Sequence, residues 1–301
     1  MIAVWQTAAL VRIPAVGVVW YTSRRAMGRK TRSVTMFLQS FLSFVWTAVV
    51  ASWMGEFDFS TWSLIALLTG VFNGIAIYLM WNANAISVSK NGFFTAFDDI
   101  GAMIITMIAV PLSIVGIHLS TVAGMVICIC SALALAYNNW RKKRTSDPGV
   151  IPMVFYVYAI GYAIFWGLAI FGIGYLARSG IGIWRFASMW YLGSSLVGAV
   201  ILLLDLKGSI PKRPTATAPT RTVVVEAIVL AAAVSIALIF QFLAFGTQSL
   251  VVLQPVFLVI DVVMAAIIGI RFYGERKQYD GFDIKSMAVG IVGFALIFWA
   301  A

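Results

Sequence analysis

Four ionisable side chains lie deep within long apolar segments of the sequence: Arg12, Asp98, Asp99 and Asp261. A charge at the centre of a bilayer costs several kcal/mol unless it is paired or hydrated, so residues of this kind are candidates for function. An aspartate at that depth is suited to hold an amine, a cation or a proton. The structural alternative is that Arg12 pairs with an aspartate, Asp98 being our first choice, only to fix helix positions. Adjacent helical residues point about 100° apart, so Asp98 and Asp99 cannot both face one cavity.

Amide and aromatic side chains in apolar segments form a second set of candidates. A buried amide needs hydrogen-bonding partners, which either a hydrated cavity or a neighbouring helix supplies. Tyrosine and tryptophan also collect at membrane interfaces for purely physical reasons. The residues that we expect to line a cavity are Asn73, Tyr78, Trp81, Tyr162, Trp166 and Gln241. Hydrogen bonding between helices, or anchoring at the interface, stays open as the alternative for each of them.

The residue types that enzymes and metal sites need are scarce. The chain has one histidine, His118, and two cysteines, Cys128 and Cys130, whose spacing points them to different sides of a helix. The sequence shows no nucleophile beside a base, no phosphate loop and no cluster with metal-ligand spacing. We therefore expect no enzyme, no cofactor and no metal site.

The composition is that of an integral membrane protein. Of the 301 residues, 62% are hydrophobic and only 11% are charged, whereas soluble domains carry roughly 25% charged residues. About 20 mostly apolar residues are needed for a helix to cross the hydrocarbon layer. The sequence offers ten such stretches, near 2–22, 34–54, 62–81, 87–110, 119–138, 151–176, 184–204, 223–245, 249–270 and 285–300. We expect an all-α fold of about ten transmembrane helices.

The basic residues indicate an orientation. All but Arg12, Arg178 and Arg185 of the 21 lysines and arginines fall in alternate loops, beginning with the first. Because Lys and Arg accumulate in cytoplasmic loops, we expect these loops in the cytoplasm and both termini outside. Topology also explains the net charge of +10, so we expect no nucleic-acid partner.

Weak internal similarity predicts two related halves. Sliding the chain along itself brings Ser87 onto Ser249 and Asp99 onto Asp261. A half with an odd number of helices enters the membrane from the opposite side to its copy, which is the inverted-repeat geometry of many carriers. The expected division is a first five-helix repeat over 1–140, a basic and polar linker over 141–149, and a second five-helix repeat over 150–301.

The chain resembles the ten-helix, EamA-like, two-repeat members of the drug/metabolite transporter superfamily. The resemblance rests on Trp166-Gly167, Arg178, Arg185, Pro255, Gly274-Glu275, Gly290 and Gly293. The first half departs from the pattern, with Trp5-Gln6 and Arg12 where Trp-Gly would fall, and Leu112-Ser113 where Gly-Glu is expected. The resemblance implies a cavity with a mixed polar and aromatic lining, which suits amino acids, nucleosides or sugars.

Our leading hypothesis is a secondary transporter of a small polar metabolite that works by alternating access. One alternative is a pathway for cations, such as a divalent metal, lined by Asp98, Asp99 and Asp261. A second alternative is a structural or lipid-handling membrane protein without transport. The expected partners are a small-molecule substrate, the lipid bilayer and a coupling proton or cation. We expect a monomer or homodimer in a bacterial or archaeal plasma membrane.

Overall fold

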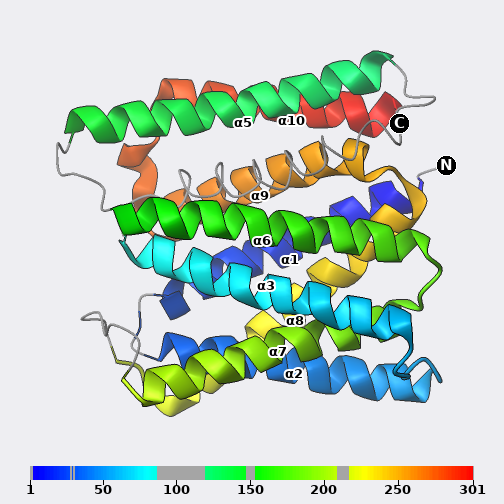
Figure 1. The fold of residues 1–301 in the computed structure, drawn as a ribbon. Coiled ribbons are helices and arrows are strands. Elements are labelled where there is room, and N and C mark those ends of the chain that lie inside the picture. The colour runs from blue at the N-terminus through cyan, green and yellow to red at the C-terminus, as the bar shows by residue number, and fades with distance from the viewer. Residues whose placement is uncertain are drawn as a thin grey trace.

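The computed structural model describes residues 3–27, 29, 31–86, 119–146, 153–208 and 217–300, and in these ranges it is entirely helical. It contains nine α-helices and one short 3-10 helix, with no strand among the described residues. Their bounds are α1 Val4–Met27, α2 Arg32–Trp53, α3 Thr61–Ile86, α5 Leu119–Ser146, α6 Met153–Arg178, α7 Ile183–Leu206, α8 Thr220–Thr247, α9 Leu250–Phe272, η2 Glu275–Gln278 and α10 Gly281–Ala300. The helices lie alongside one another, with α5 and α10 at one edge and α2 and α7 at the other (Figure 1).

Seven of the described helices are long and apolar enough to cross a membrane. They are Arg32–Trp53, Thr61–Ala83, Val157–Arg178, Ile183–Leu206, Thr220–Thr247, Val252–Phe272 and Gly281–Ala300. Large apolar side chains also cover the outside of the bundle, as Val49, Ile160 and Leu203 illustrate with more than half of their surface exposed. Exposure of so much apolar surface to water is unfavourable, whereas contact with the lipid tails of a membrane is favourable. The chain is a multi-pass membrane protein.

The expected helices and the observed ones agree closely where both can be compared. The stretches expected at 34–54, 184–204 and 249–270, for example, correspond to α2, α7 and α9. The expected segment 87–110 lies outside the described residues. Helix α5 continues to Ser146, so residues 141–146 of the expected linker are helical.

Small residues allow the closest helix contacts. A Cβ at Gly70 of α3 would overlap the backbone of α7 at Trp190, and one at Gly193 of α7 would overlap the backbone of α3. In the α5 and α10 pair, Gly124 and Gly293 bring the two backbones together in the same way. Because lipid supplies no hydrophobic force between helices, this close packing is what holds membrane helices together.

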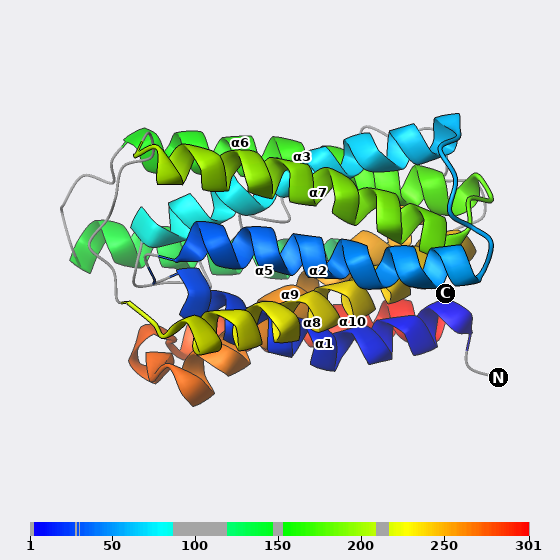
Figure 2. The same ribbon diagram turned by 90° about the horizontal axis from the view of Figure 1, so that it is seen from below.

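The bundle has two distinct ends. Helix α1 begins and α10 ends at the same end, which we call the terminal end, and α1 ends and α2 begins at the other, which we call the basic end (Figures 1 and 2). Figure 2 shows α3, α6 and α7 along one side of the bundle and α1, α8 and α10 along the other.

The largest apolar core cluster lies in the terminal half of the bundle. It is built from the first turns of α1, α7 and α9 and the last turns of α6 and α8, which all lie at that end. The clusters toward the basic end are smaller and separate from one another. The bundle is therefore packed tightly at its terminal end and more loosely beyond its middle.

Candidate substrate cavity

A cavity of about 170 Å³ lies between the two sides of the bundle. Its lining comes from α1, α2, α3, α6, α7, α8 and α9. The polar lining residues are Arg12, Ser23, Gln39, Ser40, Asn73, Gln241 and Asp261, and the aromatic ones are Trp20, Trp81, Tyr162, Trp166, Trp190 and Tyr191. Concave sites with apolar and aromatic walls and a few convergent polar groups are the usual form of a small-molecule site.

Seven of the ten residues predicted from the sequence line this cavity: Arg12, Asn73, Trp81, Tyr162, Trp166, Gln241 and Asp261. Tyr78 instead lines a small neighbouring pocket with Arg32, Asn82 and Asp205. Asp98 and Asp99 lie outside the described residues. The structure thus brings most of the predicted set together, and their role in binding stays a prediction.

Arg12 and Asp261 form an ion pair across the interface of α1 and α9. Arg12 Nη2 lies 3.0 Å from Asp261 Oδ2, and the two side chains are 6% and 17% exposed. The guanidinium carbon also lies 4.6 Å from the ring centre of Phe257, one helical turn before Asp261. The expected pairing of Arg12 with an aspartate is present with Asp261, and our first choice, Asp98, lies outside the described residues.

The pair leaves hydrogen-bonding capacity unused. Arg12 Nε and Nη1 are buried without a hydrogen-bond partner among the described residues. Buried donors without an acceptor cost roughly 1–3 kcal/mol each. The Arg24 and Glu275 pair also has buried atoms without a partner, but neither of its residues lines the cavity. Because Arg12 lines the cavity, a polar group of a bound molecule is in a position to satisfy them.

Asn73 has a structural role, whatever else it does. Its amide nitrogen donates to Ser194 Oγ at 2.9 Å, and Ser194 Oγ in turn donates to the Gly70 carbonyl at 2.9 Å. These bonds join α3 to α7 next to the contact at Gly70. The alternative that we left open for the amides, hydrogen bonding between helices, holds for Asn73.

Aromatic side chains pack together on the terminal side of the cavity. The rings of Phe186 and Phe242 stack with centroids 4.5 Å apart, and those of Phe245 and Phe257 meet edge to face at 5.5 Å. On α1, by contrast, the lining runs from Arg12 toward the basic end and reaches Ser23. The cavity therefore extends from the middle of the bundle toward the basic end.

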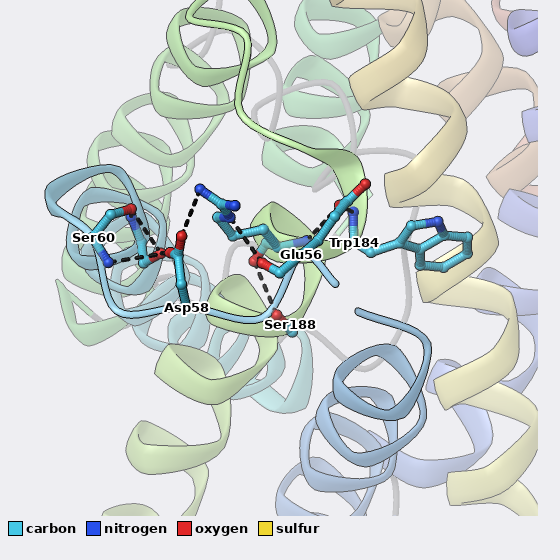
Figure 3. A network of polar contacts seen from close by, with 7 residues as sticks. Glu56, Asp58, Ser60, Trp184 and Ser188 are labelled. Atoms are coloured by element: carbon cyan, nitrogen blue, oxygen red, sulfur yellow. Dashed lines mark hydrogen bonds and ion pairs between the residues drawn. The ribbon is translucent and has the colours of Figure 1, made fainter. Parts of the chain in front are cut away.

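A polar network joins the loops at the terminal end (Figure 3). Glu56, in the connection between α2 and α3, accepts hydrogen bonds at Oε2 from the backbone nitrogens of Trp184 at 3.0 Å and Arg185 at 3.2 Å. These are free N–H groups in the first turn of α7, so Glu56 acts as an acidic cap for that helix. Arg185 Nη1 lies 2.9 Å from Asp58 Oδ2.

Asp58 is held in its charged form at the same place. The hydroxyl of Ser63 donates to Asp58 Oδ1 at 2.9 Å, and this hydrogen bond is the main reason why the pKa of Asp58 is lowered. The network ties the connection between α2 and α3 to the start of α7.

Ion pairs connect the helices at the basic end. Arg24 of α1 pairs with Glu275 of η2, and Arg25 Nε lies 3.2 Å from Glu226 Oε1 of α8. Arg29, just beyond α1, also pairs with Glu226. These contacts join the end of α1 to α8 and to the connection between α9 and α10.

Sequence reasoning missed Trp20, Trp190 and Tyr191 as lining residues. Trp20 lies eight residues after Arg12 on α1, which places it on the same helix face two turns further on, and that spacing was an available signal. Trp190 and Tyr191 lie in an apolar run without an adjacent charged residue. In such a run the sequence does not distinguish an aromatic ring that faces lipid from one that faces a cavity.

Comparisons with known proteins bear on the fold. No family model matches the chain, and no curated protein matches it. Among solved structures, one described only as "Crystal structure of protein" is similar, with a TM-score of 0.62 and 17% sequence identity over 96% of each chain. At that identity the similarity concerns the fold alone, and it extends over nearly the whole length of both chains.

Proposed function

We propose that the chain is a secondary carrier that moves a small polar metabolite across the membrane by alternating access. The observation that carries this proposal is the Arg12 and Asp261 ion pair, which lies in the wall of a cavity near the middle of α1 and α9. A pair that only fixed helix positions would be best packed between helices with every donor satisfied. This pair faces a cavity and retains unpartnered donors, as a binding site for polar groups requires.

The position of the cavity supports the alternating-access part of the proposal. Two pairs of packed rings, Phe186 with Phe242 and Phe245 with Phe257, lie on its terminal side, while its lining reaches toward the basic end. A carrier at rest in one of its two states has this asymmetry, because its site opens to one side of the membrane at a time. With basic loops in the cytoplasm, this is the state that faces the cytoplasm.

The helix pairs support an inverted repeat. If α1, α2, α3 and α5 correspond to α6, α7, α8 and α10, the contact of α1 with α8 has its counterpart in that of α6 with α3. Under the same rule the pairs α2 with α7 and α5 with α10 each join equivalent helices, and both pairs are in contact. This arrangement fits the ten-helix, two-repeat form of the drug/metabolite transporter superfamily, which the sequence resembles.

A cation pathway is less well supported. Asp261 is already neutralised by Arg12 at 3.0 Å, and a metal cation at that carboxylate would be repelled by the guanidinium. Asp98 and Asp99, the other two aspartates of this alternative, lie outside the described residues.

The test is flux into proteoliposomes that contain the purified protein, measured with a panel of labelled amino acids, nucleosides and sugars. We expect uptake of at least one of them by the unmodified protein. Asp261→Asn should remain folded and lose this uptake. Asp205→Asn is the matched control, since Asp205 accepts a hydrogen bond from Ser33 outside the central cavity and should retain transport. Full transport by Asp261→Asn would show that Asp261 is a structural residue.

A further inference from the structure

The connection between α9 and α10 carries four exposed cations. They are Arg271 in the last turn of α9, Arg276 and Lys277 in η2, and Lys285 in the second turn of α10. Both η2 and α10 contact α9, and the connection lies at the basic end of the bundle, where Figure 2 draws it in orange. We call the surface that these four residues form the α9–α10 patch.

No described acid forms an ion pair with a cation of the patch. The acids of the same connection have other partners. Glu275 is buried and pairs with Arg24 of α1. Asp280 accepts a hydrogen bond from the Asn138 amide of α5 at 3.2 Å, and Asp283 is buried and accepts one from the same amide at 2.8 Å. The four positive charges of the patch are therefore not paired within the described part of the chain.

The basic end has two kinds of cation. Arg24, Arg25 and Arg29 pair with buried glutamates and hold the end of α1 to its neighbours, whereas the patch cations are exposed and have no ion pair with a described residue. The positive-inside rule explains why cations collect in these loops, but it depends little on acidic residues. It therefore does not explain why the nearby acids have partners elsewhere. Cations held close together without an acid attract an anion from outside the chain.

Apolar side chains border the patch at the depth of the lipid headgroups. The crossing segment of α9 ends at Phe272 and that of α10 begins at Gly281, so the patch lies where the chain leaves the hydrocarbon layer and enters it again. Beside the cations, Phe272, Phe282 and Ile284 have 59%, 50% and 56% of their surface exposed. Cations next to exposed apolar groups match an amphiphile with an anionic head, whereas a free anion would use the cations alone.

We propose that the α9–α10 patch binds an anionic phospholipid, with the phosphate on the cations and the acyl chains along Phe272 and Phe282. Anionic lipids give the cytoplasmic leaflet of a membrane a negative surface potential, and we expect the basic end on that side. Each cation near such a surface contributes about fivefold in affinity. This binding is separate from the central cavity and does not depend on the proposed transport.

The test is lipid binding to the purified full-length protein in neutral maltoside micelles, measured by native mass spectrometry. The probes are phosphatidylglycerol and phosphatidylcholine with identical acyl chains, so the two lipids differ only in the headgroup, and inorganic phosphate, which has the charge without the chains. We expect phosphatidylglycerol to bind at least about tenfold more tightly than phosphatidylcholine. A higher concentration of ammonium acetate should reduce this preference, and inorganic phosphate should not displace the lipid.

Two double variants with the same change in charge link the binding to the patch. Arg276→Gln with Lys277→Gln removes two cations from η2, so it should weaken phosphatidylglycerol binding by roughly tenfold or more and leave phosphatidylcholine binding unchanged. The matched control is Lys207→Gln with Arg221→Gln, because these two exposed cations also lie at the basic end, after α7 and in the first turn of α8. The control should bind both lipids as the unmodified protein does. All four residues are exposed, so the helix content and thermal unfolding of both variants should be unchanged.

Three kinds of result would overturn the inference. Equal affinity for the two lipids would show that the charge of the headgroup is not recognised. A patch variant that keeps the preference, or a control variant that loses it equally, would show that this surface is not the site. Displacement of the lipid by inorganic phosphate at millimolar concentration would indicate a site for a free anion. Because the measurement contains no transport step, its outcome is independent of whether the central cavity moves a substrate.

Discussion

Glu56 offers a sharp test of how the connection between α2 and α3 is held to the start of α7. Its carboxylate accepts two backbone hydrogen bonds from the first turn of α7, and its own carbonyl accepts a third from Arg185 Nε at 2.8 Å. Replacement by glutamine removes the negative charge but keeps one neutral acceptor. Replacement by alanine removes both side-chain hydrogen bonds and leaves the bond to the backbone carbonyl in place.

The expected magnitudes follow from these contacts. A hydrogen bond to a charged group contributes about 1.5–3 kcal/mol and a neutral one about 0.5–1.5 kcal/mol. Glu56 is only partly buried, so solvent screens its charge and the lower ends of these ranges apply. We expect Glu56→Gln to lower the free energy of unfolding by about 1 kcal/mol and Glu56→Ala by about 2–3 kcal/mol.

The assay is reversible unfolding of the purified variants in mixed micelles, followed by helix content. Ser188→Ala is the control, because the Ser188 hydroxyl donates only to the Arg185 carbonyl within its own helix, and its removal should change stability little. If both Glu56 variants have the same free energy of unfolding as the unmodified protein, the cap does not contribute to stability. If the glutamine and alanine variants lose the same amount, the hydrogen bonds are unimportant and only the charge matters.

Three further predictions follow from the packing and the charges. Arg12→Leu and Asp261→Leu should each cost about 3 kcal/mol of stability and the double change less than their sum, whereas simple additivity in a double-mutant cycle would exclude the pairing. Gly70→Ala should destabilise by about 1–3 kcal/mol or more, because its Cβ overlaps a backbone carbonyl of α7. The control is Gly281→Ala, because a Cβ at Gly281 would lie in open space. Its free energy of unfolding should equal that of the unmodified protein in the same assay. A reporter fused after Ala301 should report the extracytoplasmic side, and activity found only in the cytoplasm would overturn the orientation.

The sequence predicted the helices well because lipid imposes a simple rule. A crossing segment must be apolar over about 20 residues, and the polar breaks between such segments are easy to recognise. The rule also led to four of the polar lining residues, Arg12, Asn73, Gln241 and Asp261, since polar groups in an apolar helix must face the protein interior. That is why the amino-acid sequence alone was enough to select Arg12, Gln241 and Asp261.

The parts that could not be predicted depend on how helices rotate and meet. The partner of Arg12 depends on the depth and rotation of α1 relative to α9, and neither is encoded in local spacing. The cap that Glu56 provides for α7 joins two loops far apart in the sequence, and no local pattern marks it. The division into inverted repeats and the family resemblance stay predictions.

The most direct test of the central claim is counterflow in proteoliposomes. The vesicles are loaded with an excess of the unlabelled metabolite that the flux panel identifies, and a trace of the labelled compound is added outside. A carrier with one site that opens to each side in turn exchanges the two, so we predict that the label rises transiently inside to a concentration above that outside. A label that only equilibrates to the outside concentration would indicate a channel, and no entry at all would mean that the cavity does not transport.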